Sequence, residues 1–338
     1  MLARIRTASH ADLSAIVLLV AFGLLVLQPV LHAEFVLVDD HEILRLTLPD
    51  APAPLSQLSN RVLSDDRAAG RFRPIYWVAR LGETNLVRDR GNLPDAESGY
   101  RGLIEMLTSV IGHGMLAEEA VPMAALRAEV RHELANVLHA RERPIEAIEV
   151  AREAWGEPAY AKRDRLLVDS AAYLRDVGAL EAARDASLLA LALAGQGGEP
   201  FAGWMASTNL LEIAIDERNE TAFEHYRVAL SRAPLPPFLE AGYYTYLARG
   251  YLTFGGATGD RERALKAAQH AGRVAAAHSL HQWVFAAEAL AAQAEGPTGS
   301  TSTTKSTWDR RVAIPPDRAE VVAGAAADLH AARVAAGV

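Results

Sequence analysis

Residues 127–191 carry the same pattern of small side chains twice, and this pattern constrains the fold more than any other feature. In the first copy Ala135 lies twelve residues before Ala147, and in the second Ala171 lies twelve residues before Ala183. The two copies are 36 residues apart, and within each the apolar residues return at helical steps of three or four. Each copy therefore predicts two helices joined by a short turn, and successive copies are expected to stack through their small residues.

The pattern resembles the tetratricopeptide repeat, a helix pair with a period of roughly 34 residues. In that family small residues let the paired antiparallel helices approach closely, and its terminal proline has a counterpart in Pro158. The resemblance implies an all-α fold, an antiparallel helix-pair (tetratricopeptide-like) solenoid over residues 96–295. The first copy opens with a helix expected at 123–140. Beyond the two clear copies we expect helices at 100–111, 204–215, 220–231, 243–254 and 280–294, and a turn lengthened by an insertion at 255–260.

The N-terminal part contains a long apolar run. Residues 1–12 include Arg4 and Arg6, and residues 13–33 are largely apolar. About 20 such residues suffice to cross a bilayer, so this run predicts an N-terminal transmembrane helix, with the two arginines on the cytoplasmic side. A signal peptide cleaved after Ala33 is the alternative, although Leu31 is large for a cleavage site. Both alternatives place the rest of the chain outside the cytoplasm.

Residues 34–95 contain two charged motifs. Asp39 and Asp40 follow the apolar run, and Arg71 and Arg73 lie in a Gly-Arg-Phe-Arg-Pro segment. This order resembles the start of the GT-C superfamily of membrane glycosyltransferases, in which an acid of the first outer loop acts as base or metal ligand beside a lipid-phosphate sugar donor. The resemblance implies that role, and a divalent metal, for Asp39 and Asp40. Guanidinium groups bind phosphate in a bidentate manner, so Arg71 and Arg73 could hold the donor.

The chain also departs from that family. GT-C enzymes build their cavity from many membrane helices, and no apolar run after Trp77 is long enough to span a bilayer. Without those helices we expect Asp39 and Asp40 to lie in a solvated, catalytically idle turn, and residues 71–77 to anchor the chain at the membrane surface. A reduced or truncated glycosyltransferase remains the alternative function.

Composition excludes several further classes. The net charge of −8 and the absence of a basic stripe argue against nucleic-acid binding, and the absence of cysteine excludes thiolate zinc sites and cysteine nucleophiles. His132 and Glu133 begin like a zinc-protease motif, but Asn136 replaces the second histidine. His139 lies two turns after His132, too far to share one ion. We therefore expect no metal site and no cofactor.

Four tyrosines on the expected helix 243–254 are candidates for binding a partner. Tyr243 and Tyr246 share one side and could anchor a peptide, whereas Tyr244 and Tyr251 are a heptad apart and expected in the core; core packing of the first two is the alternative. After the repeats, residues 296–316 predict a flexible linker and residues 317–338 a C-terminal helix. The sequence thus predicts a single-pass membrane protein whose extracytoplasmic repeats hold a protein or peptide partner.

Overall fold

The structure, a computed structural model, describes residues 74–112, 117–197, 200–255, 258–296 and 312–338. The chain divides into two compact units, residues 1–79 and 80–338. Of the first unit only residues 74–79 are described, and they form the beginning of a helix. Everything that follows concerns the second unit.

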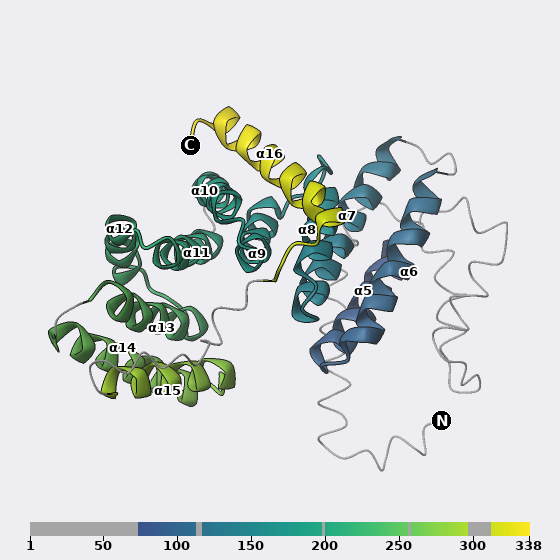
Figure 1. Cartoon of the computed structure of the whole chain (residues 1–338). Coiled ribbons are helices and arrows are strands. Elements are labelled where there is room, and N and C mark those ends of the chain that lie inside the picture. The colour runs from purple at the N-terminus through teal and green to yellow at the C-terminus, as the bar shows by residue number, and fades with distance from the viewer. Residues whose placement is uncertain (1–73, 113–116, 198–199, 256–257, 297–311) are drawn as a thin grey trace, which may run out of the picture. The chain divides into compact units, whose positions relative to one another are not determined.

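The described residues are helical throughout, without a strand, which confirms the all-α prediction (Figure 1). The α-helices in chain order are α5 (Pro74–Asp89), α6 (Leu93–Gly112), α7 (Ala117–Ala140), α8 (Pro144–Trp155), α9 (Arg163–Asp176), α10 (Leu180–Gly197), α11 (Pro200–Asp216), α12 (Glu220–Ser231), α13 (Pro237–Phe254), α14 (Thr258–Ala277), α15 (His281–Glu295) and α16 (Ala319–Ala336), with a 3₁₀ turn at Pro316–Arg318 before the last. Helices adjacent in sequence pack against one another, from α6 on α7 to α14 on α15.

The same tight turn joins five of these helix pairs. In each turn a backbone N–H donates to the carbonyl five residues earlier, as in the Schellman motif that ends many helices, at Asn92 to Val87, Arg143 to Leu138, Ala179 to Leu174, Asn219 to Ala214 and Leu280 to Ala275. The residue before each donor has a positive φ. Gly91 and Gly178 adopt this left-handed conformation without a Cβ penalty, whereas the other turns place Glu142, Arg218 and Ser279 there. One local geometry therefore sets the antiparallel direction of successive helices.

The helix pairs stack in a solenoid-like order. Besides contacting its neighbours in sequence, α9 contacts α7 and α11, and α13 contacts α11 and α15. We call the surface formed by α7, α9, α11 and α13 the first-helix face. The small residues that predicted this stacking lie in the core of the stacked helix pairs: Ala135, Ala147, Ala171 and Ala183 are all buried.

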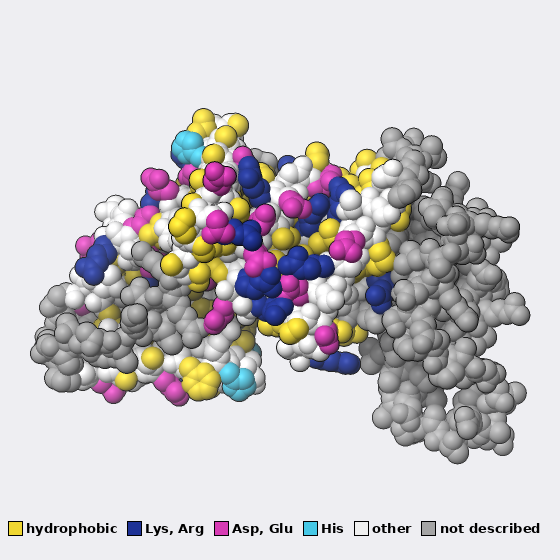
Figure 2. Space-filling model, turned by 45° about the vertical axis from the view of Figure 1, so that its right-hand side comes forward, with side chains coloured by type: hydrophobic (Ala, Val, Ile, Leu, Met, Phe, Trp, Pro, Cys, Tyr) yellow, Lys and Arg dark blue, Asp and Glu magenta, His cyan; other side chains and the backbone are white. Residues whose placement is uncertain are grey.

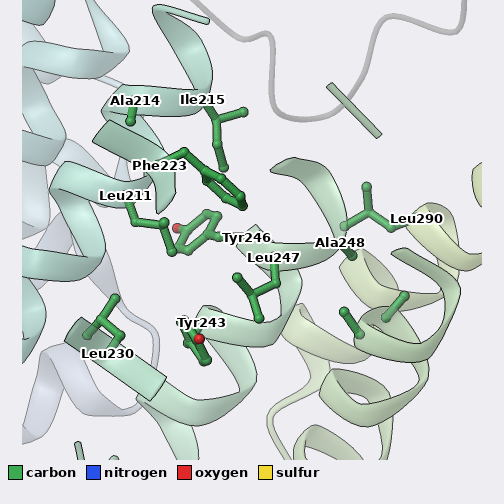
Figure 3. Close-up of a cluster of buried hydrophobic side chains, with 12 residues drawn as sticks. Leu211, Ala214, Ile215, Phe223, Leu230, Tyr243, Tyr246, Leu247, Ala248 and Leu290 are labelled. Atoms are coloured by element: carbon green, nitrogen blue, oxygen red, sulfur yellow. The ribbon is translucent and has the colours of Figure 1, made fainter. Parts of the chain in front are cut away.

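A large core cluster holds the later helices together (Figure 3). Phe223 of α12 lies at its centre and packs against Tyr251 and Phe254 of α13, with ring centroids 6.1 Å and 5.2 Å apart. Leu211 of α11 and Leu290 of α15 belong to the same cluster. Aromatic side chains bury the most area per residue, so this cluster supplies much of the packing at this end of the stack.

Two elements differ from the sequence prediction. Residues 74–89, expected in a loop segment, form helix α5, where Leu81 and Thr84 are buried three residues apart on one face. The expected insertion at 255–260 is partly helical, since α14 begins at Thr258. The expected C-terminal helix is present as α16, which docks on α8 and α10.

None of the described helices is long and apolar enough to cross a bilayer. The predicted span at residues 13–33 lies outside the described residues, as do residues 34–73 of the segment that resembles GT-C enzymes and most of the predicted linker.

Candidate functional site

A network of ion pairs runs along the first-helix face. It centres on Glu212 of α11, whose carboxylate lies between Arg175 of α9 and Arg249 of α13. Each arginine is 37 residues from Glu212, so the three occupy equivalent positions on successive first helices. Arg249 Nη1 donates to Glu212 Oε1 at 3.2 Å. Opposite charges one repeat apart thus join three helix pairs.

The network continues at both ends. Arg249 also pairs with Asp216, one turn after Glu212 on α11. At the other end Arg175 Nη2 donates to Asp176 Oδ1 at 3.0 Å, and the other carboxylate oxygen of Asp176 accepts from His139 Nε2 at 2.8 Å. The first-helix network comprises His139, Arg175, Asp176, Glu212, Asp216 and Arg249. It connects α7, α9, α11 and α13 without a break.

Burial makes this pairing necessary. Glu212 is 3 % exposed, and a carboxylate removed from water is stable as an ion only beside cations that hydrogen-bond it. Burial alone would raise the pKa of the Asp176 carboxyl, but the hydrogen bond from His139 and the charge of Arg175 outweigh it, so the pKa lies below its ordinary value. The network therefore holds Asp176 ionised at neutral pH.

A second set of polar contacts lies beside the network, between α7 and α9. His132 Nε2 is 2.7 Å from Asp169, and Nδ1 is 2.7 Å from the Tyr160 hydroxyl. With the proton on Nε2, the imidazole donates to the carboxylate and accepts from the phenol. One turn further on, Tyr173 donates to Asn136 at 2.7 Å. The residue pairs 132–169, 136–173 and 139–176 are all 37 apart, so they form a ladder between two equivalent helices.

These contacts leave the phenols protonated and part of the charged side chains exposed. Burial raises the pKa values of Tyr160 and Tyr173, which keeps both phenols protonated. Within the described ranges no three metal-ligating side chains come together. The side chains of His139, Asp176 and Arg175 remain between a fifth and a third exposed and offer both donors and acceptors to solvent.

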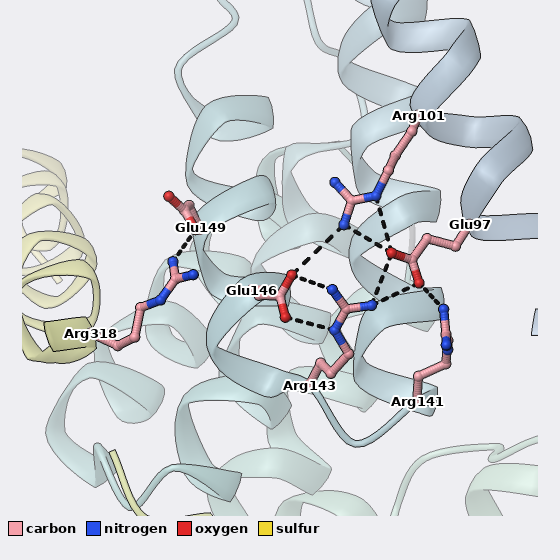
Figure 4. Close-up of polar contacts among 7 residues, drawn as sticks. All are labelled: Glu97, Arg101, Arg141, Arg143, Glu146, Glu149 and Arg318. Atoms are coloured by element: carbon pink, nitrogen blue, oxygen red, sulfur yellow. Dashed lines mark hydrogen bonds and ion pairs between the residues drawn. The ribbon is translucent and has the colours of Figure 1, made fainter. Parts of the chain in front are cut away.

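A separate network fixes α6 to the turn between α7 and α8 (Figure 4). Glu97 is buried and accepts from Arg101 at 2.9 Å and from Arg143 at 2.8 Å, while Arg141 approaches it from the other side. Arg143 also pairs with Glu146 at the start of α8. Burial would raise the pKa of Glu97, but the hydrogen bonds from Arg101 and Arg143 lower it below its ordinary value. This network is internal to the fold.

Charged side chains of both signs are interspersed over the surface in Figure 2, without an extended region of one sign. Surface pairs of this kind usually contribute little stability each.

The structure separates the four tyrosines on α13. Tyr243 and Tyr246, for which partner contact and core packing were both open, are buried in the core (Figure 3). The Tyr243 hydroxyl donates to the Arg227 carbonyl at 3.0 Å, and burial raises its pKa to about 12. Tyr244 and Tyr251, expected in the core, are only half-buried. The reason is that α13 contacts α11, α12, α14 and α15, so the side carrying Tyr243 and Tyr246 is enclosed.

Acid conditions should destabilise the fold through two carboxylates, Asp176 of the first-helix network and Glu97 of the network on α6. Because the folded-state pKa values of Asp176 and Glu97 lie below their ordinary values of 3.8 and 4.5, their contribution is fully present above pH 4.5 and is lost as pH falls through the lowered pKa values. We expect the thermal midpoint, followed by circular dichroism, to fall steeply below pH 4.5, and Asp176→Asn to be less stable at pH 7 but to show a shallower fall. An identical pH dependence in the variant would contradict this origin.

The four other predicted site residues, Asp39, Asp40, Arg71 and Arg73, lie outside the described residues. The first-helix network was not predicted, although its signal is present: residues 175, 212 and 249 alternate in charge at intervals of 37. A search for opposite charges one repeat apart would have found it. Compared with models of known protein families and with curated proteins, the sequence matches none.

Proposed function

We propose that the chain is a membrane-anchored, tetratricopeptide-like scaffold that holds a protein or peptide partner on the extracytoplasmic side. The anchor rests on the apolar run at residues 13–33, which is long enough to span a bilayer. The scaffold rests on the stacked helix pairs, because arrays of this kind present extended surfaces formed by equivalent helices.

One observation carries the proposal: a single polar network spans four successive first helices and keeps part of its side chains exposed. Its members are held in place by one another, so a partner binding there would not have to order them. An extended peptide crossing the face would meet equivalent groups on successive first helices, at positions 37 residues apart in the chain. These groups lie on rigid helices and not on loops. Charged and polar groups in such a surface give selectivity and speed of encounter more than raw affinity.

The test is partner capture from membranes solubilised in mild detergent, using the full chain with a photoreactive cross-linking residue at position 140, which is exposed and follows His139 on α7. We expect cross-links to one partner, and a loss of about tenfold in yield when Arg175→Ala is added. Lys266→Ala, which removes an exposed cation on the second helix α14, is the matched control and should leave the yield unchanged. Fractionation provides a second arm, since the chain should remain with the membrane.

Equal yields with and without Arg175→Ala, in a protein with an unchanged helical spectrum, would contradict the assignment of the first-helix face. Recovery of the intact chain in the soluble fraction would contradict the anchor. The two parts of the proposal therefore fail separately.

A further inference from the structure

The C-terminal helix α16 occupies a groove that its own side chains do not fill. It lies on α8 and α10 (Figure 1), and residues of α8 and α9 form the floor beneath it. Nine of its 18 residues are alanine, and only Val322, Ala325 and Leu329 are buried among its apolar side chains. A cavity of about 30 Å³ remains between α8, α9 and α16.

The floor of this groove carries larger apolar side chains than the helix that covers it. The cavity is lined by large side chains of α8 and α9, namely Ile148, Trp155, Leu166, Leu167 and Leu174, and on the α16 side by Ala325 and Leu329. Protein interiors are normally packed without voids of this kind, because lining atoms without partners lose dispersion contacts. A side chain larger than Ala325 at the same position would fill it.

Charged residues at the rim define which helix fits. Arg152 of α8 pairs with Asp328 at 2.6 Å, and Glu149 of α8 pairs with Arg318 at 3.1 Å (Figure 4). Asp185 of α10 receives His330 and Arg333, the latter at 2.7 Å. All four contacts join α16 to residues at least 145 positions away in sequence. A helix that enters this groove must therefore be acidic near its middle and basic towards both ends.

We propose that the groove between α8 and α10 is a binding site for an amphipathic helix of a partner protein, and that α16 occupies it in the free chain. The partner helix carries a leucine-sized residue at the position of Ala325, aliphatic residues at the positions of Val322 and Leu329, and an acidic residue opposite Arg152. Helix-in-groove recognition uses anchors at this three- and four-residue spacing. This site lies between the second helices α8 and α10, over buried residues of α9, and does not depend on the first-helix face being a binding surface.

Because α16 is part of the same chain, it competes with a partner helix for the groove at high effective concentration. The apparent affinity for a partner helix is therefore the intrinsic affinity multiplied by the fraction of chains in which α16 has left the groove. The probe is a fluorescein-labelled peptide of residues 316–338 carrying Ala325→Leu, titrated against the full chain in mild detergent and followed by fluorescence anisotropy. Chains carrying Asp328→Arg with Leu329→Ala have a weakened α16, because Asp328→Arg places two cations together at Arg152. We expect these chains to bind the peptide at least about tenfold more tightly than the wild type.

Two further variants test whether α16 competes with the peptide and whether the charge of Arg152 selects the helix that binds. Ala325→Leu in the chain itself fills the cavity from within and should reduce peptide binding below that of the wild type. Arg152→Glu in the otherwise wild-type chain places a second carboxylate against Asp328 and weakens α16, so this chain should bind a peptide that carries Asp328→Arg but not the peptide that keeps Asp328. Circular dichroism checks that each variant keeps its helices.

Equal peptide binding by the wild-type and weakened chains, or binding that is insensitive to Arg152→Glu, would overturn the proposal. A wild-type dimer that the peptide converts to monomers would also overturn it, because the occupant would then be α16 of a second copy. Failure of peptide binding together with intact capture at the first-helix face would leave the proposed function standing.

Discussion

Glu212→Ala is expected to lower the free energy of unfolding by about 3–5 kcal/mol, the cost of removing one partner from a buried ion pair. Glu212 is almost fully buried, and its carboxylate is shared by Arg175 and Arg249. After the substitution both guanidinium groups lose their common acceptor while their side chains stay about four-fifths buried. Urea denaturation of the full chain in mild detergent, followed by circular dichroism, measures the change.

Glu224→Ala is the matched control, because Glu224 pairs with Arg227 on α12 but is nearly half exposed. Exposed pairs of this kind contribute at most about 1 kcal/mol, so the control should unfold close to the wild type. Replacing Glu212, Arg175 and Arg249 together by leucine and methionine should restore much of the lost stability, since apolar residues of similar volume substitute well for buried ions. A Glu212→Ala variant no less stable than the control would show that the network does not stabilise the stack.

Much of the architecture follows from local rules that the sequence displays. The alanines at 135, 147, 171 and 183 could be identified as contact positions because only small residues permit two helices to approach closely, and all four are buried. The short turn expected between the two helices of the first copy ends where Pro144 begins α8, a position where its missing N–H costs nothing. These features depend on residues a few positions apart.

Features that depend on distant parts of the chain were not predicted. Which tyrosines of α13 are buried depends on which sides of the helix its neighbours enclose. Four tyrosines at one- to five-residue spacings are compatible with more than one choice of buried side, so their spacing alone does not decide it. Likewise, an alanine-rich helix such as α16 has no strong apolar side in its sequence, so its docking on α8 and α10 is set by contacts with Glu149, Arg152 and Asp185. The first-helix network shares this property, because its charges meet only when the helix pairs stack.

Gly250→Ala is expected to destabilise the fold by about 1–3 kcal/mol, the cost of overpacking a closely packed core. A Cβ at Gly250 of α13 would lie 2.2 Å from Cε2 of Phe223, within the cluster of Figure 3. The ring cannot move away freely, since Tyr251 and Phe254 pack against it. In an exposed helix the same substitution would instead be favourable, by roughly 0.5–1 kcal/mol, through the loss of glycine's flexibility.

Gly272→Ala in α14 provides the matched comparison, because its Cβ would meet only the Ala287 Cβ at 3.6 Å, an ordinary contact. We expect this control to be slightly more stable than the wild type, so the two Gly→Ala variants should shift the urea midpoint in opposite directions. Adding Phe223→Leu to Gly250→Ala should cost less than the sum of the single changes, by roughly 0.5–3 kcal/mol, because the shorter side chain leaves room for the new methyl group. Simple additivity of the two changes would mean that the close approach of α13 to α12 is not what requires glycine at position 250.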